Sequence, residues 1–150
     1  MKNLFEPKVK DEIISRIETL TPQSKALWGK MNVMQGMRHM AMAFDISTGK
    51  LDPHLEKEYP LPKWLIKFLL INVKAPKGRA STFKEMDLIK NNINPEDFNL
   101  EKHNLKKTVE NFYNVTQLIP ANKYAGKFSK NDWGKVNYNH TDHHLRQFGA

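Results

Sequence analysis

Apolar residues recur at helical spacing in four long stretches of the chain. In each stretch the apolar side chains fall on one face of a helix with 3.6 residues per turn, and polar residues fall opposite. Prolines or capping residues mark most of the ends. The predicted helices cover residues 8–20, 32–46, 99–119 and 130–148.

The second predicted helix is apolar on most of its sides. Its start is well marked, because Asn32 can cap the first turn and Gln35, three residues later, completes a capping box. Only Arg38 and Asp45 form a charged sector around its axis. A helix with so narrow a polar face belongs in the middle of a domain.

A long crossover, residues 47–98, separates the first two helices from the last two. Five prolines interrupt it, and one short helix is expected after Pro62, within residues 62–75. Apolar residues surround most of the axis of that helix, whereas a membrane-surface helix has a broad polar face. We expect it to pack against the other helices or against a second copy in a homodimer, and not to cross or dock on a membrane.

Length and composition favour one domain spanning residues 1–150, and the predicted helices make it an all-α domain. With 39% hydrophobic and 27% charged residues, the chain resembles ordinary globular proteins. Cysteine is absent, which excludes disulfides and thiolate metal ligands, so that any metal must take nitrogen or oxygen ligands. The N-terminal residues contain no secretion signal, and we expect a cytoplasmic protein.

The formal net charge of +8 raises the question of an anionic partner. The lysines are scattered along the chain, without a basic block interleaved with aromatic residues and without a nucleic-acid-binding motif. This distribution favours a solvated basic surface and no specific nucleic-acid partner.

Three histidines fall on helix faces that are expected to point inward. In the last predicted helix, His140 and His144 lie near the centre of an apolar stripe, four residues apart, a spacing at which both can bind one metal ion. In the second, His39 shares its face with Gly36 and Ala43, whose small side chains should leave space beside it.

These residues could instead be ordinary core histidines, each neutral and hydrogen-bonded. A buried imidazole left without a partner costs about 1–3 kcal/mol, and a metal ion would satisfy one nitrogen on all three. The pattern therefore favours a metal site formed by His39, His140 and His144. By contrast, His54 in the crossover and His103 on a polar helix face are expected at the surface.

Several sequence blocks resemble the DUF1569 branch of the DinB/YfiT-like superfamily. They are LTPQS at 20–24, WGKMNVMQ at 28–35, FS at 128–129, WGK at 133–135 and HTDHHLRQFG at 140–149, together with His39. The resemblance implies a four-helix bundle with up-down-down-up topology, its long crossover holding the short extra helix. It also implies a divalent metal, often zinc or nickel, held by a histidine of the second helix and a His-x-x-x-His pair of the last, which correspond to His39, His140 and His144.

The superfamily includes enzymes that act with low-molecular-weight thiols. The resemblance therefore implies a metal-dependent enzyme acting on a small-molecule substrate, either a thiol S-transferase using an external thiol or a hydrolase that activates water. The alternative is a non-catalytic metal-binding or stress-response module, whose ion clamps two helices together. Gln35, Asp142 and His143 are candidates for acid–base roles or, preferably, for hydrogen bonds that orient the ligand imidazoles.

Overall fold

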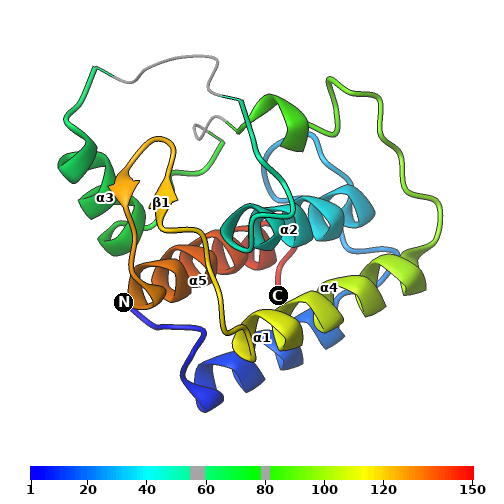
Figure 1. Cartoon of the computed structure of the whole chain (residues 1–150). Coiled ribbons are helices and arrows are strands. Elements are labelled where there is room, and N and C mark those ends of the chain that lie inside the picture. The colour runs from blue at the N-terminus through cyan, green and yellow to red at the C-terminus, as the bar shows by residue number, and fades with distance from the viewer. Residues whose placement is uncertain (55–59, 79–81) are drawn as a thin grey trace.

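The computed structural model describes residues 1–54, 60–78 and 82–150, and this part of the chain is mostly helical (Figure 1). The predicted all-α class is confirmed. A 3₁₀ turn, η1, precedes α4, and an antiparallel hairpin, β1–β2, precedes α5. The elements are α1 (Pro7–Thr19), α2 (Val33–Ser47), α3 (Lys63–Asn72), η1 (Lys84–Met86), α4 (Phe98–Tyr113), β1 (Ala121–Asn122), β2 (Gly126–Lys127) and α5 (Lys130–Gln147).

One hydrophobic core lies between α1, α2, α4 and α5. The helix α2 contacts both α4 and α5, and α1 contacts the same two helices. The core draws on all four of them, with fully buried side chains such as Ile13, Met37, Phe44, Leu105 and Leu145. The apolar α2 packs against α4, α5 and η1 (Figure 1).

The expected capping box at the start of α2 is present. The Asn32 side chain accepts from the Gln35 backbone amide at 2.8 Å, and the Gln35 side chain accepts from the Asn32 amide at 3.0 Å. The space expected beside Gly36 is filled, because a Cβ on Gly36 would lie 2.2 Å from the ring of Phe148. Gly36 therefore allows the end of α5 to approach α2, and it provides no room for a ligand.

The predicted helix over residues 99–119 ends early, at Tyr113. Asn114 caps it, since the Asn114 side chain donates to the carbonyl of Glu110 at 3.0 Å. Ile119 then donates its backbone amide to Ser47, and its carbonyl accepts from the Trp133 indole. These contacts hold the chain after α4 in a non-helical path, and the hairpin that follows was not predicted.

The short helix α3 forms as expected and packs against α5 and β2. Asn139 of α5 donates to the carbonyls of Leu70 and Val73, which satisfies acceptors at the end of α3. On the other side of α3, Trp64 is 70% exposed and Phe68 is 54% exposed.

We expect a second copy of the chain to cover this side of α3, because burying a large apolar side chain contributes about 1.5–3 kcal/mol. Trp64→Glu combined with Phe68→Glu should then halve the mass measured by sedimentation and leave the helical circular dichroism unchanged. The matched control is Leu100→Glu, a similarly exposed apolar residue on α4. Flotation of the wild-type protein with anionic vesicles at physiological salt would contradict this prediction.

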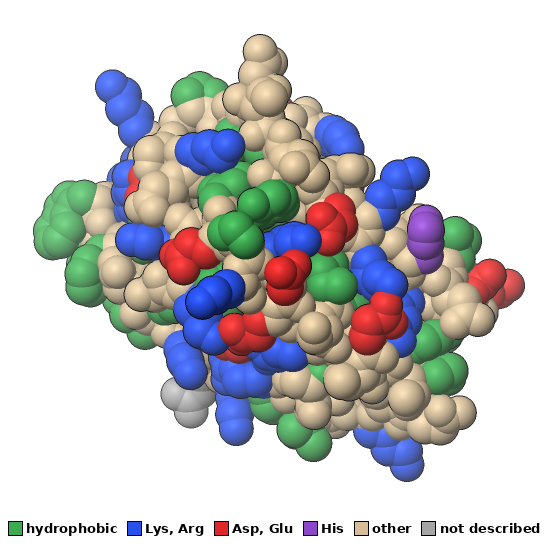
Figure 2. Space-filling view, turned by 90° about the horizontal axis from the view of Figure 1, so that it is seen from below, with side chains coloured by type: hydrophobic (Ala, Val, Ile, Leu, Met, Phe, Trp, Pro, Cys, Tyr) green, Lys and Arg blue, Asp and Glu red, His purple; other side chains and the backbone are tan. Residues whose placement is uncertain are grey.

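Basic side chains on the face formed by α1 and α4 alternate with acidic ones (Figure 2). Lys10 lies 3.0 Å from Glu110, and Glu18 contacts both Lys102 and Lys106. This interspersed arrangement agrees with the scattered lysines of the sequence. Among the helices of the described ranges, none has the length and hydropathy that crossing a bilayer requires.

Candidate metal centre

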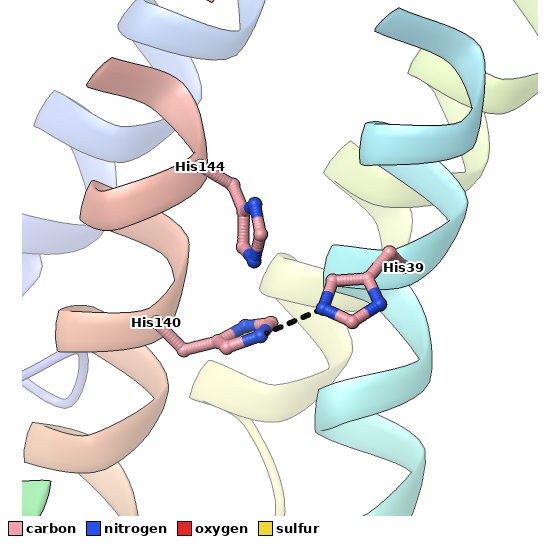
Figure 3. Close-up of side chains that lie close together, drawn as sticks. All are labelled: His39, His140 and His144. Atoms are coloured by element: carbon pink, nitrogen blue, oxygen red, sulfur yellow. Dashed lines mark hydrogen bonds between the residues drawn. The ribbon is translucent and has the colours of Figure 1, made fainter. Parts of the chain in front are cut away.

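The three histidines predicted to form a site do meet in the structure. His39 projects from α2 toward His140 and His144, which project from successive turns of α5 (Figure 3). One ring nitrogen from each lies within 4.8 Å of the other two. The closest pair is Nε2 of His39 and Nε2 of His140, at 3.1 Å. Segments far apart in the sequence thus bring three imidazoles to one point.

Hydrogen bonds on the far side of two rings fix their tautomers. Nδ1 of His39 donates to the carbonyl oxygen of Met86 at 2.9 Å, and Nδ1 of His144 donates to Oε1 of Gln147 at 2.8 Å. The Gln147 amide is itself oriented, because its nitrogen donates to the carbonyl of Trp28. A neutral imidazole with its hydrogen on Nδ1 has a lone pair on Nε2. Both rings therefore present a lone pair toward the point where the three side chains meet.

The surroundings of the histidines disfavour their protonated forms. Burial lowers the pKa of His39 below its ordinary value of 6.5, and burial lowers that of His144 to about 3. The pKa of His140 lies well below the ordinary value because of burial and because protonated His144 and His39 would repel it. All three are neutral at physiological pH, as metal ligands must be.

The arrangement fits a divalent transition metal. Nitrogen ligands about 2.0–2.1 Å from a tetrahedral zinc ion lie about 3.3 Å from each other, close to the 3.1 Å between His39 and His140. Nδ1 of His140 is buried and has no hydrogen-bond partner in the described ranges. No hydrogen bond on the far side of the His140 ring therefore fixes its tautomer. With its hydrogen on Nδ1, the ring would present the lone pair of Nε2 to an ion.

A cavity of about 280 Å³, lined by both polar and apolar residues, opens beside the three histidines. Trp28, Lys30, Asp87 and His143 also line it. Within the described ranges, the three histidines are the one group of His, Asp or Glu side chains close enough together to hold an ion. An ion bound by them would therefore keep at least one coordination position facing this cavity.

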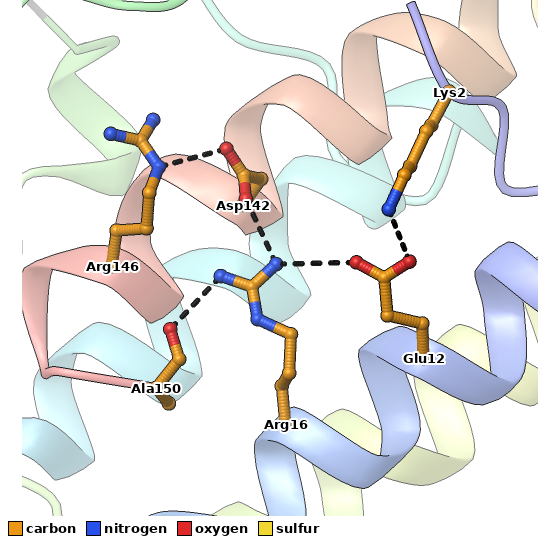
Figure 4. Close-up of polar contacts among 6 residues, drawn as sticks. All are labelled: Lys2, Glu12, Arg16, Asp142, Arg146 and Ala150. Atoms are coloured by element: carbon orange, nitrogen blue, oxygen red, sulfur yellow. Dashed lines mark hydrogen bonds and ion pairs between the residues drawn. The ribbon is translucent and has the colours of Figure 1, made fainter.

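Two of the three residues expected to orient the ligands have other contacts. The amide nitrogen of Gln35 donates to Ile93 and Asn94, and its oxygen caps α2. Both oxygens of Asp142 are bound by arginines, Arg16 at 2.8 Å and Arg146 at 2.9 Å (Figure 4). Asp142 faces α1, away from the three histidines.

The third, His143, does lie beside the site. Its ring packs edge-on against His144, with 5.0 Å between centroids, and against Trp28. Its pKa is lowered chiefly by burial and by the nearby charge of Arg146, so that the ring is neutral at physiological pH. His143 does not belong to the group of three that could share an ion.

Sequence reasoning missed the residues that orient His39 and His144. Gln147 could have been found, because it lies one helical turn after His144 and points to the same side of α5. The Met86 carbonyl could not, since it belongs to η1 in the crossover and a backbone atom leaves no mark on the sequence. The expected exposure of His54 and His103 is confirmed.

Replacing Gln147 by Met should weaken metal binding by about 10–100-fold, the usual cost of losing a hydrogen bond to a ligand histidine. Methionine keeps most of the volume and removes the acceptor for His144. Gln35→Met is the matched control, a buried glutamine whose loss should change metal affinity less than about threefold. Competition with a metal-binding dye measures both variants. Equal affinities would contradict this role for Gln147.

Comparison with protein-family models, with curated proteins and with solved structures gives no match to this chain. The functional assignment therefore rests on the geometry of the three histidines and their surroundings.

Proposed function

We propose that this protein is a metal-dependent enzyme of the DUF1569 branch of the DinB/YfiT-like superfamily, most simply a thiol S-transferase. In this proposal His39, His140 and His144 hold one zinc or nickel ion. The helices α1, α2, α4 and α5 would form the up-down-down-up bundle, with α3 as the extra helix of the crossover. The observation that carries the proposal is the convergence of three neutral imidazoles at the edge of a cavity.

The cavity favours catalysis over a purely structural ion. A structural zinc site is closed by a fourth protein ligand, and the described ranges offer only three side chains. His143, the nearest further candidate, has a hydrogen bond with the backbone of Ala75 instead. The competing function, an ion that only clamps α2 to α5, does not account for the space in front of the ligands.

Three neutral ligands leave a divalent ion its full charge, which would lower the pKa of a thiol or of water in the cavity. The surrounding residues suit a thiol that carries negative charge elsewhere. Lys30 lines the cavity, and Nζ of Lys77 lies 4.9 Å from the ring centre of Trp28, which also lines it. His143, neutral and beside the ligands, can accept the proton that a thiol loses. Hydrolysis is the second candidate, since water can enter the same space, but it does not account for the two lysines.

Cobalt-substituted protein provides a direct test of the open position. Adding a cellular thiol, such as a cysteine-containing peptide, should produce a thiolate-to-cobalt charge-transfer band, and His140→Ala should show none.

A screen of the zinc and nickel forms with several thiols and electrophilic acceptors would then identify the reaction. His140→Ala serves as the blank and Lys30→Ala tests recognition of anionic thiols.

If metal binds in the ratio of one ion per chain but the cobalt spectrum does not respond to any thiol or to azide, the site is closed. That result would support the clamp and overturn the enzymatic proposal.

A further inference from the structure

A second cavity, with a volume of about 410 Å³, lies on the other side of His140. It is lined by α2, α3, η1, α5 and the hairpin, and its volume falls in the range of about 300–1,000 Å³ typical of small-molecule sites. The lining is largely apolar and includes Ile46, Ile66, Leu70, Phe83 and Val136.

Three polar side chains in this lining are already engaged. Asn137 donates to the hydroxyl of Ser47 at 3.1 Å, and the oxygen of Asn122 accepts from two backbone amides of the hairpin. The Trp133 indole donates to Ile119. A ligand in this cavity would therefore meet apolar surface and few free hydrogen-bonding groups.

This apolar cavity and the smaller cavity described above meet at the candidate metal centre. Three residues, Thr82, Met86 and His140, line both of them. His140 is a candidate ligand, and Met86 holds His39 through its carbonyl. An apolar body in the larger cavity would thus lie next to the ion, while a polar molecule could enter from the opposite side.

We propose that the apolar cavity binds the second substrate, a small molecule with an aliphatic or aromatic body and a polar end that reaches the metal centre. This inference rests on the proposed function and deepens it, because a transferase needs two substrates, and a largely apolar cavity and a mixed one converge on one site. A hydrolase of a polar substrate would have no use for the larger cavity.

Two hydroxamates that share a metal-binding head test the proposal by calorimetry on zinc-loaded protein. Octanohydroxamate carries six more methylenes than acetohydroxamate. Because each buried methylene contributes about fourfold in affinity, we expect the longer compound to bind at least about 100-fold more tightly. Equal affinities would overturn the proposal.

Ala43→Phe should fill part of the cavity, because Ala43 lines it from α2. The expected advantage of octanohydroxamate then falls below about tenfold, while acetohydroxamate binding, which reports the metal centre, stays unchanged. Val136→Phe tests the same point from α5, in case the first variant does not fold. Ala121→Phe is the matched control, an exposed alanine outside the cavity.

The outcomes separate the two proposals. Failure of both hydroxamates to bind zinc-loaded protein would mean that the metal centre has no open position, which overturns the proposed function. Binding of both with no effect of chain length, or an undiminished effect in the Ala43→Phe and Val136→Phe proteins, would overturn only the assignment of the apolar cavity.

Discussion

Replacing His39, His140 or His144 by alanine is expected to lower metal affinity by at least about 100-fold, more than the loss of an orienting hydrogen bond costs. Each variant removes one of three ring nitrogens that lie within 4.8 Å of one another. Purified wild-type protein should contain about one divalent ion per chain, and the variants should contain a small fraction of that. Elemental analysis of protein dialysed against metal-free buffer measures both quantities.

His54→Ala and His103→Ala are the controls, since both residues are exposed. They should retain full metal occupancy. His143→Ala provides a stricter comparison, because His143 borders the same cavity without belonging to the group of three. Full occupancy in two of the three ligand variants would exclude the site, and metal loss in His143→Ala equal to that in His144→Ala would show that the wrong histidine is paired with His140.

Asp142→Ala is expected to lower the free energy of unfolding by about 3 kcal/mol, the lower end of the cost of breaking a buried ion pair. The Asp142 side chain is 10% exposed and binds two arginines, one from α1 and one from α5 itself. Arg16 also donates to the carbonyl of Ala150, so that the change would weaken the link between α1 and the end of α5. Metal affinity should change less than threefold. Denaturant unfolding and dye competition measure the two effects.

The stabilisation that Asp142 provides depends on pH, and the pKa of Asp142 sets the direction of this dependence. Burial alone would raise the pKa of Asp142, but hydrogen bonds from Arg16 and Arg146 outweigh burial and lower it from its ordinary value of 3.8. The stabilisation is therefore present above about pH 4 and is lost as the pH falls through the lower folded-state pKa.

The control for Asp142→Ala is Asp52→Asn, which removes an exposed partner of Lys123 and should cost less than about 1 kcal/mol. Metal loss in Asp142→Ala without loss of stability would instead support a role in orienting the ligands.

Periodicity and capping were sufficient to predict the long helices of this fold. The capping box at Asn32 placed the start of α2, and the apolar stripes placed the bodies of α1 and α5. The end of α4 could not be predicted, because Ile119 is held by hydrogen bonds with Ser47 and Trp133, which lie far away in the sequence. Tertiary contacts of this kind override local helical preference.

The three candidate metal ligands could also be predicted from the sequence, because helix geometry alone sets the direction in which a side chain points. The roles of Gln35 and Asp142 were not, because sequence proximity does not show which partner a polar side chain finds. Asp142 follows His140 by two residues and so lies on nearly the opposite side of α5, where Arg16 is available. Similarly, the space inferred beside Gly36 was taken by Phe148, whereas that beside Ala43 opens into the apolar cavity.

The helix α5 contacts α1, α2 and α3, yet among the helices of the described ranges it is the last to leave the ribosome. At about 5–20 residues per second, synthesis of the stretch from Tyr113 to Gln147 takes about 2–7 seconds. During that interval the apolar faces of α1, α2 and α4 have no α5 to cover them. The nascent chain should therefore be a client for chaperones until α5 emerges, and only then can both His140 and His144 join His39.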